Sequence, residues 1–348
     1  MDFCNKFEEK ISAALNSYPK GTVFLAAVSG GADSMAMLAA LCNVKLNSHL
    51  YCLHVEHGLR PIQESCGDAD FVFRFCQDNQ IECRIENIPP GKIASYAQKK
   101  GIGIEAAARF FRHRALLNEA KRLDSPGKKT IILLAHTKDD LLENVLMRVF
   151  RGAGPAGLAA MPQKRKRLHR PILSFNRSDI IDYLKAKNIP WREDSTNTDT
   201  KFLRNSIRHQ LIPLLTQVFP SWKKSLNAVA ETQSLAADFI TSEAKHRIKW
   251  DKLNDSLFTD KDIFFAQPLI IREEAVFQGI NAFDQNTLMS SCKKRIKSIK
   301  RSVIRKFCAG DTNAAVLGSV KIYCKKEKII LSYVCEELFE SGFSQLIN

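Results

Sequence analysis

The stretch TVFLAAVSGGADS, residues 22–34, decides the fold of this chain. Residues 22–28 form an apolar run of strand length, and the two glycines that follow permit a tight turn into a helix predicted from about Asp33 to Leu41. Backbone N–H groups at such a turn, with the positive end of the helix dipole, suit a bound phosphate, and the carboxylate of Asp33 fits there if a metal ion lies between. The alternative is an ordinary turn in which Asp33 or Ser34 caps the helix.

The first half of the chain alternates strand-like with helix-like segments. Further strands are predicted at residues 50–55, 83–88 and 130–135, further helices at 62–78, 104–122, 138–150 and 177–187, and a hairpin near the end at 319–324 and 328–334. The alternation of apolar strands with helices predicts an α/β fold with a parallel sheet covered by helices on both faces. Ligands of such sheets bind beyond the carboxyl ends of the strands, so residues that follow strands are the first candidates for a site.

Polar residues follow the fourth predicted strand in AHTKDDLLEN, residues 135–144. On a helix that begins here, Asp139 and Glu143 are four residues apart and share a face, whereas Asp140 lies on a second line. Three carboxylates at one strand end can hold a metal ion or an ammonium group. The alternative is a capping box between Thr137 and Asp140, since acidic residues near a helix N-terminus suit its dipole.

Two shorter segments offer further polar groups. Glu105 and Arg109 can pair on a helix, while Arg109 and Arg112 can reach a phosphate from one side; a solvated surface pair is the alternative. His54 and His57 lie three residues apart and could bind a metal ion, but Gly58 breaks the segment, which disfavours a zinc site.

The charge of the chain favours a polyanionic partner. Its net charge is +15 and its pI about 9.4, an excess that attracts nucleic acid. Two basic runs, residues 164–170 and 293–306, are candidate RNA contacts, although such runs can also be solvated faces. In the second run, Ile296, Ile299 and Val303 fall at helical spacing, which predicts a helix with an apolar seam and a cationic outer face.

Cysteine usage and hydropathy point to the cytoplasm. The ten cysteines contain no C-x-x-C pair, which disfavours zinc-ribbon, iron–sulfur and thioredoxin-like sites and leaves most of them as small buried apolar residues. No apolar run is long enough to span a bilayer, and the first residues do not read as a secretory signal. We therefore expect a cytoplasmic protein with no membrane partner.

The order of these segments resembles the tRNA(Ile)-lysidine synthetases, a branch of the PP-loop ATP pyrophosphatases. The motifs that carry the resemblance, over about residues 20–220, are SGGADS (29–34), HGLR (57–60), E-x-x-x-R-x-x-R (105–112), AHTKDDLLE (135–143), RGAG (151–154), RPIL (170–173), DSTNTD (194–199) and the residues Arg204, Asn205 and Arg208. Thr137 stands where the family often has a second histidine, and His113 where it often has an aromatic residue.

The resemblance implies a Rossmann-like N-terminal domain that binds adenine nucleotide, a helical middle segment and a small α+β C-terminal domain. We expect an ATP-binding catalytic domain at residues 1–215, a mainly helical linking and tRNA-contact region at 216–290, and a basic tRNA-binding domain at 291–348. The implied reaction adenylates the wobble cytidine of the minor isoleucine tRNA, the one with a CAU anticodon, and then ligates L-lysine to it, so that the tRNA reads AUA in place of AUG. ATP is a substrate and Mg²⁺ the cofactor; whether the chain forms a homodimer is left open.

The resemblance also assigns roles to individual residues. The ATP site is expected at Ser29, Gly30, Gly31, Ala32, Asp33, Ser34, His54 and His136, with Mg²⁺ at Asp33. The catalytic group is Asp33, Arg109, Arg112, Asp139, Asp140 and Glu143, of which Asp139, Asp140 or Glu143 holds lysine. Contacts to tRNA are expected from Arg204, Arg208, Lys293, Lys294, Arg295, Lys297, Lys300 and Arg301.

Two other functions stay open at this point. One is a different PP-loop enzyme, such as a tRNA thiolase or an amidating synthetase, although many of these thiolases use the C-x-x-C pairs that this chain lacks. The other is a non-catalytic RNA-binding protein that retains a relic nucleotide loop.

Overall fold

The computed structural model describes residues 3–44, 48–59, 62–193, 203–253, 256–286 and 301–334. The chain forms two compact units, one of Met1–Ala153 with Ala160–Ala230 and the other of Gly154–Ala159 with Glu231–Asn348. The expected division at residues 215 and 290 stays a prediction.

A mostly parallel sheet of six strands is the centre of the first unit, in the order β3-β2-β1-β4-β6-β5. Its strands are β1 (Val23–Ala27), β2 (His49–Glu56), β3 (Glu82–Asn87), β4 (Ile131–Leu134), β5 (Lys164–Arg165) and β6 (Leu168–His169). Neighbouring strands run parallel from β3 to β6, and only the edge strand β5 is antiparallel. The predicted parallel sheet is therefore confirmed. Its buried central strand β1 comes from the apolar run at residues 22–28.

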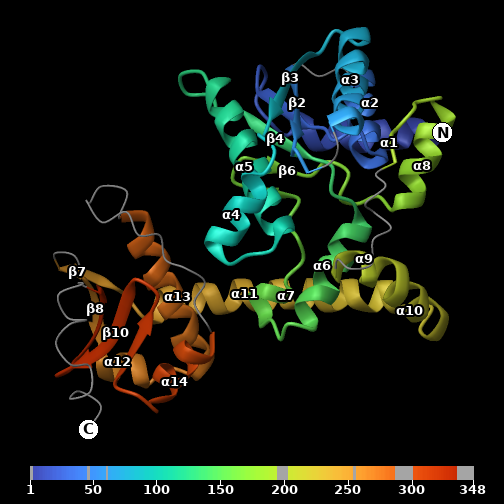
Figure 1. Ribbon diagram of the computed structural model, residues 1–348. Helices are drawn as coiled ribbons and strands as arrows, with labels where there is room; N and C mark the ends of the chain where they lie inside the picture. Colours follow the sequence, from blue (N-terminus) through green and yellow to red (C-terminus); the bar gives the residue numbers. More distant parts are fainter. Residues whose placement is uncertain are drawn as a thin grey trace. The chain divides into compact units, whose positions relative to one another are not determined.

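Helices cover both faces of this sheet (Figure 1). They are α1 (Phe3–Asn16), α2 (Ala32–Asn43), α3 (Ile62–Asp78), α5 (Ile104–Arg122) and α8 (Arg177–Ala186). The helix α4 (Lys92–Lys100) packs against α5, and α6 (Lys138–Val149) belongs to a separate core cluster. One face packs against α1, α2, α3 and α8 in a core that contains Phe7, Met35 and Tyr183, whereas Leu116 of α5 packs on the other face with Leu25 and Leu53. The predicted bounds of α3 and α5 match the structure, and α3 has clear apolar periodicity.

Short helices follow the sheet and lead out of the first unit. They are α9 (Leu203–Ser206), a π-helical turn (Ile207–Leu211) and α10 (Ile212–Val218). The long helix α11 (Trp222–Arg247) follows them and continues into the second unit. The second unit also takes up α7 (Pro155–Leu158). Within the described residues, no helix is both long enough and apolar enough to cross a membrane.

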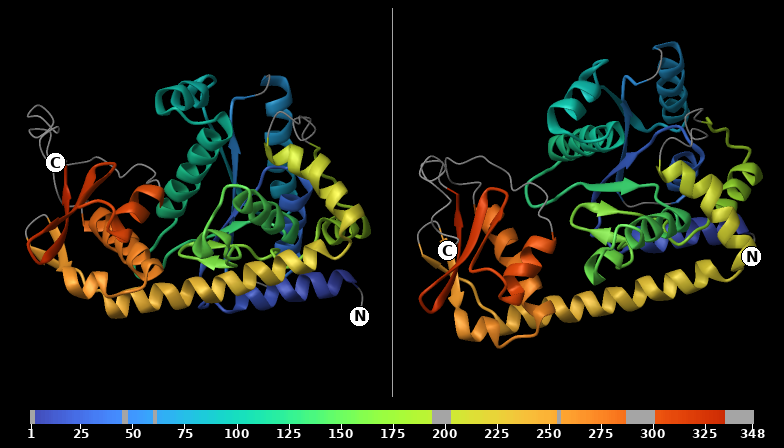
Figure 2. Two further views of the ribbon diagram at one scale, coloured as in Figure 1. Left: turned by 90° about the horizontal axis from the view of Figure 1, so that it is seen from below. Right: turned by 60° about the horizontal axis from the view of Figure 1, so that its bottom comes forward.

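The second unit is an antiparallel sheet with helices packed against it (Figure 2). The strand order is β7-β8-β11-β10-β9, from β7 (Asp251–Leu253), β8 (Ser256–Asp260), β9 (Ala314–Leu317), β10 (Val320–Lys325) and β11 (Lys328–Tyr333). The helices are α12 (Lys261–Phe265), α13 (Leu269–Asn286) and α14 (Arg301–Ala309). The predicted hairpin is confirmed as β10–β11, where alternate side chains such as Ile322 and Leu331 enter the core.

Candidate active site

The loop after β1 leaves the start of α2 without a side-chain cap. Gly31 is the N-cap residue and makes no side-chain capping bond, so the alternative of a cap by Asp33 or Ser34 is wrong. Instead the Ser34 hydroxyl donates to the carbonyl of Gly31 at 2.9 Å and accepts from the N–H of Ser29 at 3.1 Å. These bonds hold the loop curved. Among the residues that the structure describes, no side chain caps the first N–H groups of α2, which suits an anion.

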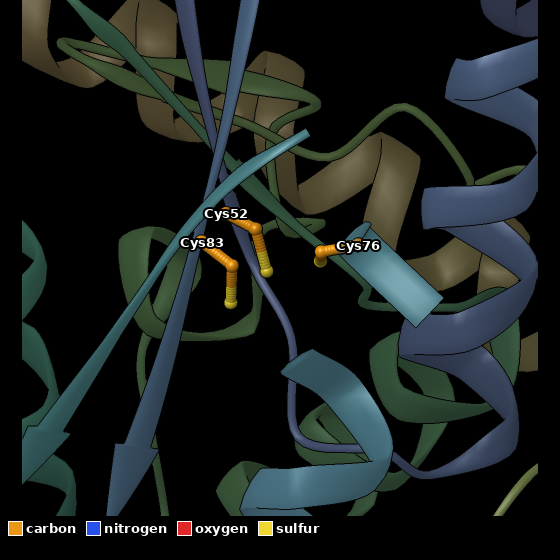
Figure 3. A group of neighbouring side chains, drawn as sticks. All are labelled: Cys52, Cys76 and Cys83. Carbon is orange, nitrogen blue, oxygen red and sulfur yellow. The ribbon is translucent and has the colours of Figure 1, made fainter. Parts of the chain in front are cut away.

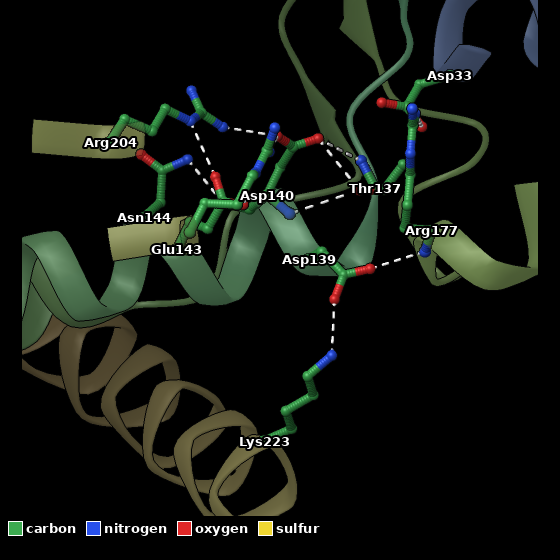
Figure 4. Close-up of polar contacts among 10 residues, drawn as sticks. Asp33, Thr137, Asp139, Asp140, Glu143, Asn144, Arg177, Arg204 and Lys223 are labelled. Carbon is green, nitrogen blue, oxygen red and sulfur yellow. Dashed lines mark hydrogen bonds and ion pairs between the residues drawn. The ribbon is translucent and has the colours of Figure 1, made fainter. Parts of the chain in front are cut away.

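Asp33 lies in the first turn of α2 and pairs with Arg177 of α8. The Arg177 guanidinium Nη1 is 2.5 Å from Asp33 Oδ1 (Figure 4). Burial raises the pKa of Asp33, the charge of Arg177 lowers it, and the nearby Asp140 carboxylate raises it again. The Asp33 carboxylate provides hard oxygen atoms of the kind that Mg²⁺ prefers, so this residue fits a magnesium ligand.

Asp139 lies at the start of α6, beyond the end of β4. Its Oδ2 accepts from the backbone N–H of Arg177 at 2.7 Å, and its Oδ1 accepts from Nζ of Lys223 at 2.9 Å (Figure 4). Arg177 thus joins the two expected sites, since its side chain contacts Asp33 and its backbone contacts Asp139. Burial raises the pKa of Asp139, but the Lys223 ammonium and the Arg177 N–H lower it more, so the carboxylate is ionised at neutral pH.

Asp140 and Glu143 form a separate ion-pair cluster with two arginines. The capping box is confirmed, because Asp140 Oδ2 accepts from the N–H of Thr137 at 2.9 Å while the Thr137 hydroxyl accepts from the N–H of Asp140. The other oxygen of Asp140 accepts from Arg204 at 2.6 Å. Glu143, only 1% exposed, accepts from Nε of Arg204 at 2.9 Å and from Nε of Arg208 at 2.7 Å.

The side chains of α6 therefore group differently from the sequence prediction. Asp139 contacts Lys223 and Arg177, whereas Glu143 shares Arg204 with Asp140 (Figure 4). Positions three apart on a helix are neighbours as well as positions four apart, and the arginines from α9 and the π-helical turn select the pair at 140 and 143.

Positive groups gather beside these carboxylates. Burial lowers the pKa of Arg112, and the charges of Arg109 and Arg204 lower it further. His136 has its pKa lowered to about 4, first by burial and then by the charges of Arg170, Arg112 and Arg109 against the opposing effect of Asp140. A bound anion would stabilise these arginines, because it offsets the repulsion between their like charges. The imidazole of His136 is neutral at pH 7.

His54 supports the loop from the neighbouring strand. It is 3% exposed, and its Nδ1 lies 3.0 Å from the carbonyl oxygen of Val28, the residue before the loop. The imidazole thereby fixes the end of β1 against β2, which is compatible with its expected place at the ATP site.

Some of the expected tRNA contacts are held by internal ion pairs. Arg301 donates to the carboxylate of Glu273 at 2.9 Å, and Glu273 is only 1% exposed. In the run 164–170, Arg167 pairs with Asp124 at 2.7 Å. The segments 57–60 and 194–199 lie partly or wholly outside the described residues, as do Lys293, Lys294, Arg295, Lys297 and Lys300.

Two residues at the site were missed by sequence reasoning. Arg177 occupies the first position of α8, where a cation is unfavourable for the helix dipole, and this conflict is a signal that can mark a functional residue. Lys223 lies 84 residues from Asp139 and has no local signature of this kind.

Comparison with known proteins gives the site a family context. Residues 4–215 match the PP-loop domain family. The chain is 42% identical over 223 residues to a tRNA(Ile)-lysidine synthase of Treponema denticola, which covers 64% of this chain and 47% of that protein. It is 33% identical over 266 residues to the tRNA(Ile)-lysidine synthase of Thermosipho africanus, covering 76% of this chain and 58% of that protein.

The chain spans about half the length of the curated relatives that it matches. Among solved structures, the U34-tRNA thiolase NcsA from Methanococcus maripaludis superposes with a TM-score of 0.52 at 16% identity, over 66% of this chain and 80% of that one. At this identity the superposition shows a shared fold alone.

Proposed function

The chain belongs to the PP-loop domain family, and from this premise we propose that it is a ligase that adenylates the wobble cytidine of the CAU-anticodon isoleucine tRNA and then joins L-lysine to it. The names of its relatives support the substrate, and the geometry supports a nucleotide site and an amine site next to each other. The observation that carries the proposal is Arg177, which links Asp33 at the phosphate loop with Asp139 at the end of β4. A nucleotide on the loop and an amine on Asp139 would therefore lie side by side.

The first step transfers AMP. The carbonyl oxygen of the cytidine attacks the α-phosphorus of ATP, a new P–O bond forms, and pyrophosphate leaves. The uncapped N–H groups at the start of α2 would hold the phosphates, while Arg109 and Arg112 would stabilise the charge on the adenylate and the leaving group. When bound, Mg²⁺ would neutralise phosphate charge, with Asp33 as its ligand.

The second step joins lysine. The free amine attacks the activated base carbon, the C–O bond breaks, and AMP leaves with the oxygen. Among the three candidate carboxylates we assign the lysine ammonium to Asp139. Both oxygens of each carboxylate accept bonds, but the partners differ. Asp140 and Glu143 are bonded to Thr137, Arg204 or Arg208. One oxygen of Asp139 accepts from the ammonium of the half-exposed Lys223, which the ammonium of a substrate lysine would replace.

Recognition of tRNA is proposed for exposed basic groups. Arg165 and Lys166 are exposed on the β5–β6 hairpin, and the run at 293–300 adds a dense positive charge. Arg204, Arg208 and Arg301 remain candidates, but each would have to give up part of an internal ion pair to reach a phosphate.

The test separates the two steps. The protein is incubated with α-labelled ATP and unmodified tRNA without lysine, and label in the RNA is expected; unlabelled lysine added afterwards should release it as AMP. Asp33→Asn should abolish the transfer, whereas Lys224→Ala, at an exposed position of α11, should leave it unchanged. No transfer by the wild type beside an active control enzyme, or sulfur in the product RNA, would refute the proposal.

A further inference from the structure

A cluster of three thiols lies on the first unit, apart from the carboxylates of the proposed reaction. Cys52 of β2, Cys76 of α3 and Cys83 of β3 have Sγ atoms that all lie within 4.8 Å of one another (Figure 3). Among the described residues this is the one group of three metal-ligating side chains at such spacing. All three are free thiols in the structure.

The fold places these thiols together on elements that are themselves well fixed. Cys52 and Cys83 are direct partners in the parallel register of β2 and β3, so both side chains leave the same face of the sheet. Cys76, at 0% exposure, reaches them from the last turns of α3, and Cys52 is 1% exposed, whereas Cys83 is only half-buried. The cluster is thus anchored from three elements and open on the Cys83 side.

We propose that Cys52, Cys76 and Cys83 bind one thiophilic d10 metal ion, such as Zn²⁺ or Cu⁺. A Zn–S bond of about 2.3 Å places sulfur ligands about 3.8–4.0 Å apart, so sulfurs within 4.8 Å need only small side-chain adjustments. Thiolate ligands select soft cations, in contrast to the carboxylate oxygens of Asp33, which suit Mg²⁺. The two sites therefore call for different metals.

A bound ion would fasten α3 to the sheet. Phe71 and Val72, one turn before Cys76, form the wall beside the phosphate loop, since a Cβ atom built on Gly30 would lie 3.7 Å from Phe71 and 3.5 Å from Val72. The ion binds the folded arrangement of three separated elements, so it should stabilise the first unit in proportion to metal concentration. This role is structural and does not depend on the proposed reaction.

The experiment uses the full chain, reduced and freed of metal, and titrates it separately with Zn²⁺ and with Cu⁺ under anaerobic conditions. Elemental analysis after desalting gives the stoichiometry, Cd²⁺ reports thiolate ligation by its ultraviolet charge-transfer band, and thermal melting gives the stabilisation. The variants are Cys76→Ala and the half-buried Cys83→Ser, with Cys308→Ala, a buried thiol of the second unit, as the matched control.

We expect the wild type and Cys308→Ala to retain one ion per chain, to show the Cd²⁺ band and to melt at a higher temperature with metal. Cys83→Ser and Cys76→Ala should lose all three responses, and Cys83→Ser decides the matter if Cys76→Ala does not fold. Failure of the wild type to retain either ion, equal retention by every variant, or a disulfide within the trio in place of an ion would overturn the proposal.

Discussion

Replacing Gly30 tests the geometry of the loop at residues 29–34, the proposed phosphate site, without changing a polar side chain. Gly30 has φ +90°, a backbone conformation that L side chains rarely adopt. An added Cβ would meet Val72, Phe71 and Arg192 at 3.5, 3.7 and 3.9 Å, which are ordinary contacts, so there is room for the methyl group. The cost of Gly30→Ala therefore comes from the backbone alone, about 1–3 kcal/mol.

Gly31→Ala is the matched control. Gly31 has φ −73°, and its Cβ would approach only Ser29 Oγ, at 3.6 Å. Alanine lowers the conformational entropy of the unfolded chain, which stabilises the folded protein by about 0.4–1 kcal/mol. Alanine is also a poorer N-cap residue than glycine, which destabilises the folded protein by a similar amount, so the net change in stability should be small.

Urea unfolding of both variants gives the difference in stability, and calorimetric ATP titration gives the effect on binding. If Gly30→Ala relieves its strain by distorting the loop, ATP affinity falls by about 5- to 150-fold, the equivalent of 1–3 kcal/mol. Equal destabilisation by the two variants, or unchanged stability and ATP affinity in Gly30→Ala, would refute the reasoning.

Three further predictions concern the amine site, pH and RNA. Lys223→Ala removes the ion pair that competes with substrate lysine for Asp139, so the KM for lysine should fall about two- to fivefold, as expected for one exposed ion pair. Lys224→Ala should leave the KM unchanged, and a raised KM in Lys223→Ala would contradict this. Burial lowers the pKa of His169 in the folded state to about 4, whereas its pKa in the unfolded state is about 6.5. As the pH falls below about 6.5, the unfolded state therefore binds a proton that the folded state does not, and the free energy of unfolding decreases until about pH 4. His169→Phe should reduce the loss of unfolding free energy between about pH 7.5 and about pH 5 by up to about 2 kcal/mol in urea titrations, and an unchanged pH profile would contradict the assignment. Replacing residues 293–295 with alanine should flatten the salt dependence of tRNA binding by about 2–3 in log–log slope, and an unchanged slope would make the run a solvated face.

The parallel sheet was predictable because its signals are local. Residues 23–28 are apolar throughout, and α3 has helical apolar periodicity over several turns. The same holds for the β10–β11 hairpin, where alternation and the tight turn at Lys326, with φ 54°, coincide. Patterns of period two or near 3.6 residues need no knowledge of tertiary contacts.

Other parts of the fold had no such signal. The strand β7 has three residues, all exposed, and α13 carries apolar side chains on more than one face, since Ile271 is buried while the adjacent Ile270 is 38% exposed. The strands β7 and β8 join the sheet through a strand that comes much later in the sequence, because β11 lies between β8 and β10. A local sequence pattern does not predict this pairing.

The sequence does not predict the partners of the expected site residues. Residues 135–144 and 29–34 were identified from their place after strands, yet the pairing of Asp139 with Lys223 and of Glu143 with Arg204 joins segments 84 and 61 residues apart. The cysteines show the same limit: Cys52, Cys76 and Cys83 have no motif spacing and meet only through the register of β2 and β3.

Incorporation of labelled lysine into RNA is the most direct test of the central claim. The protein is incubated with ATP, labelled L-lysine and unmodified tRNA carrying the CAU anticodon, beside the same tRNA with uridine at the wobble position. We predict stable, ATP-dependent label in the first RNA, mapped by nuclease digestion to the wobble nucleoside, and none in the second. Absence of label in the first RNA while a control lysidine synthase succeeds, or equal label in both RNAs, would contradict the claim.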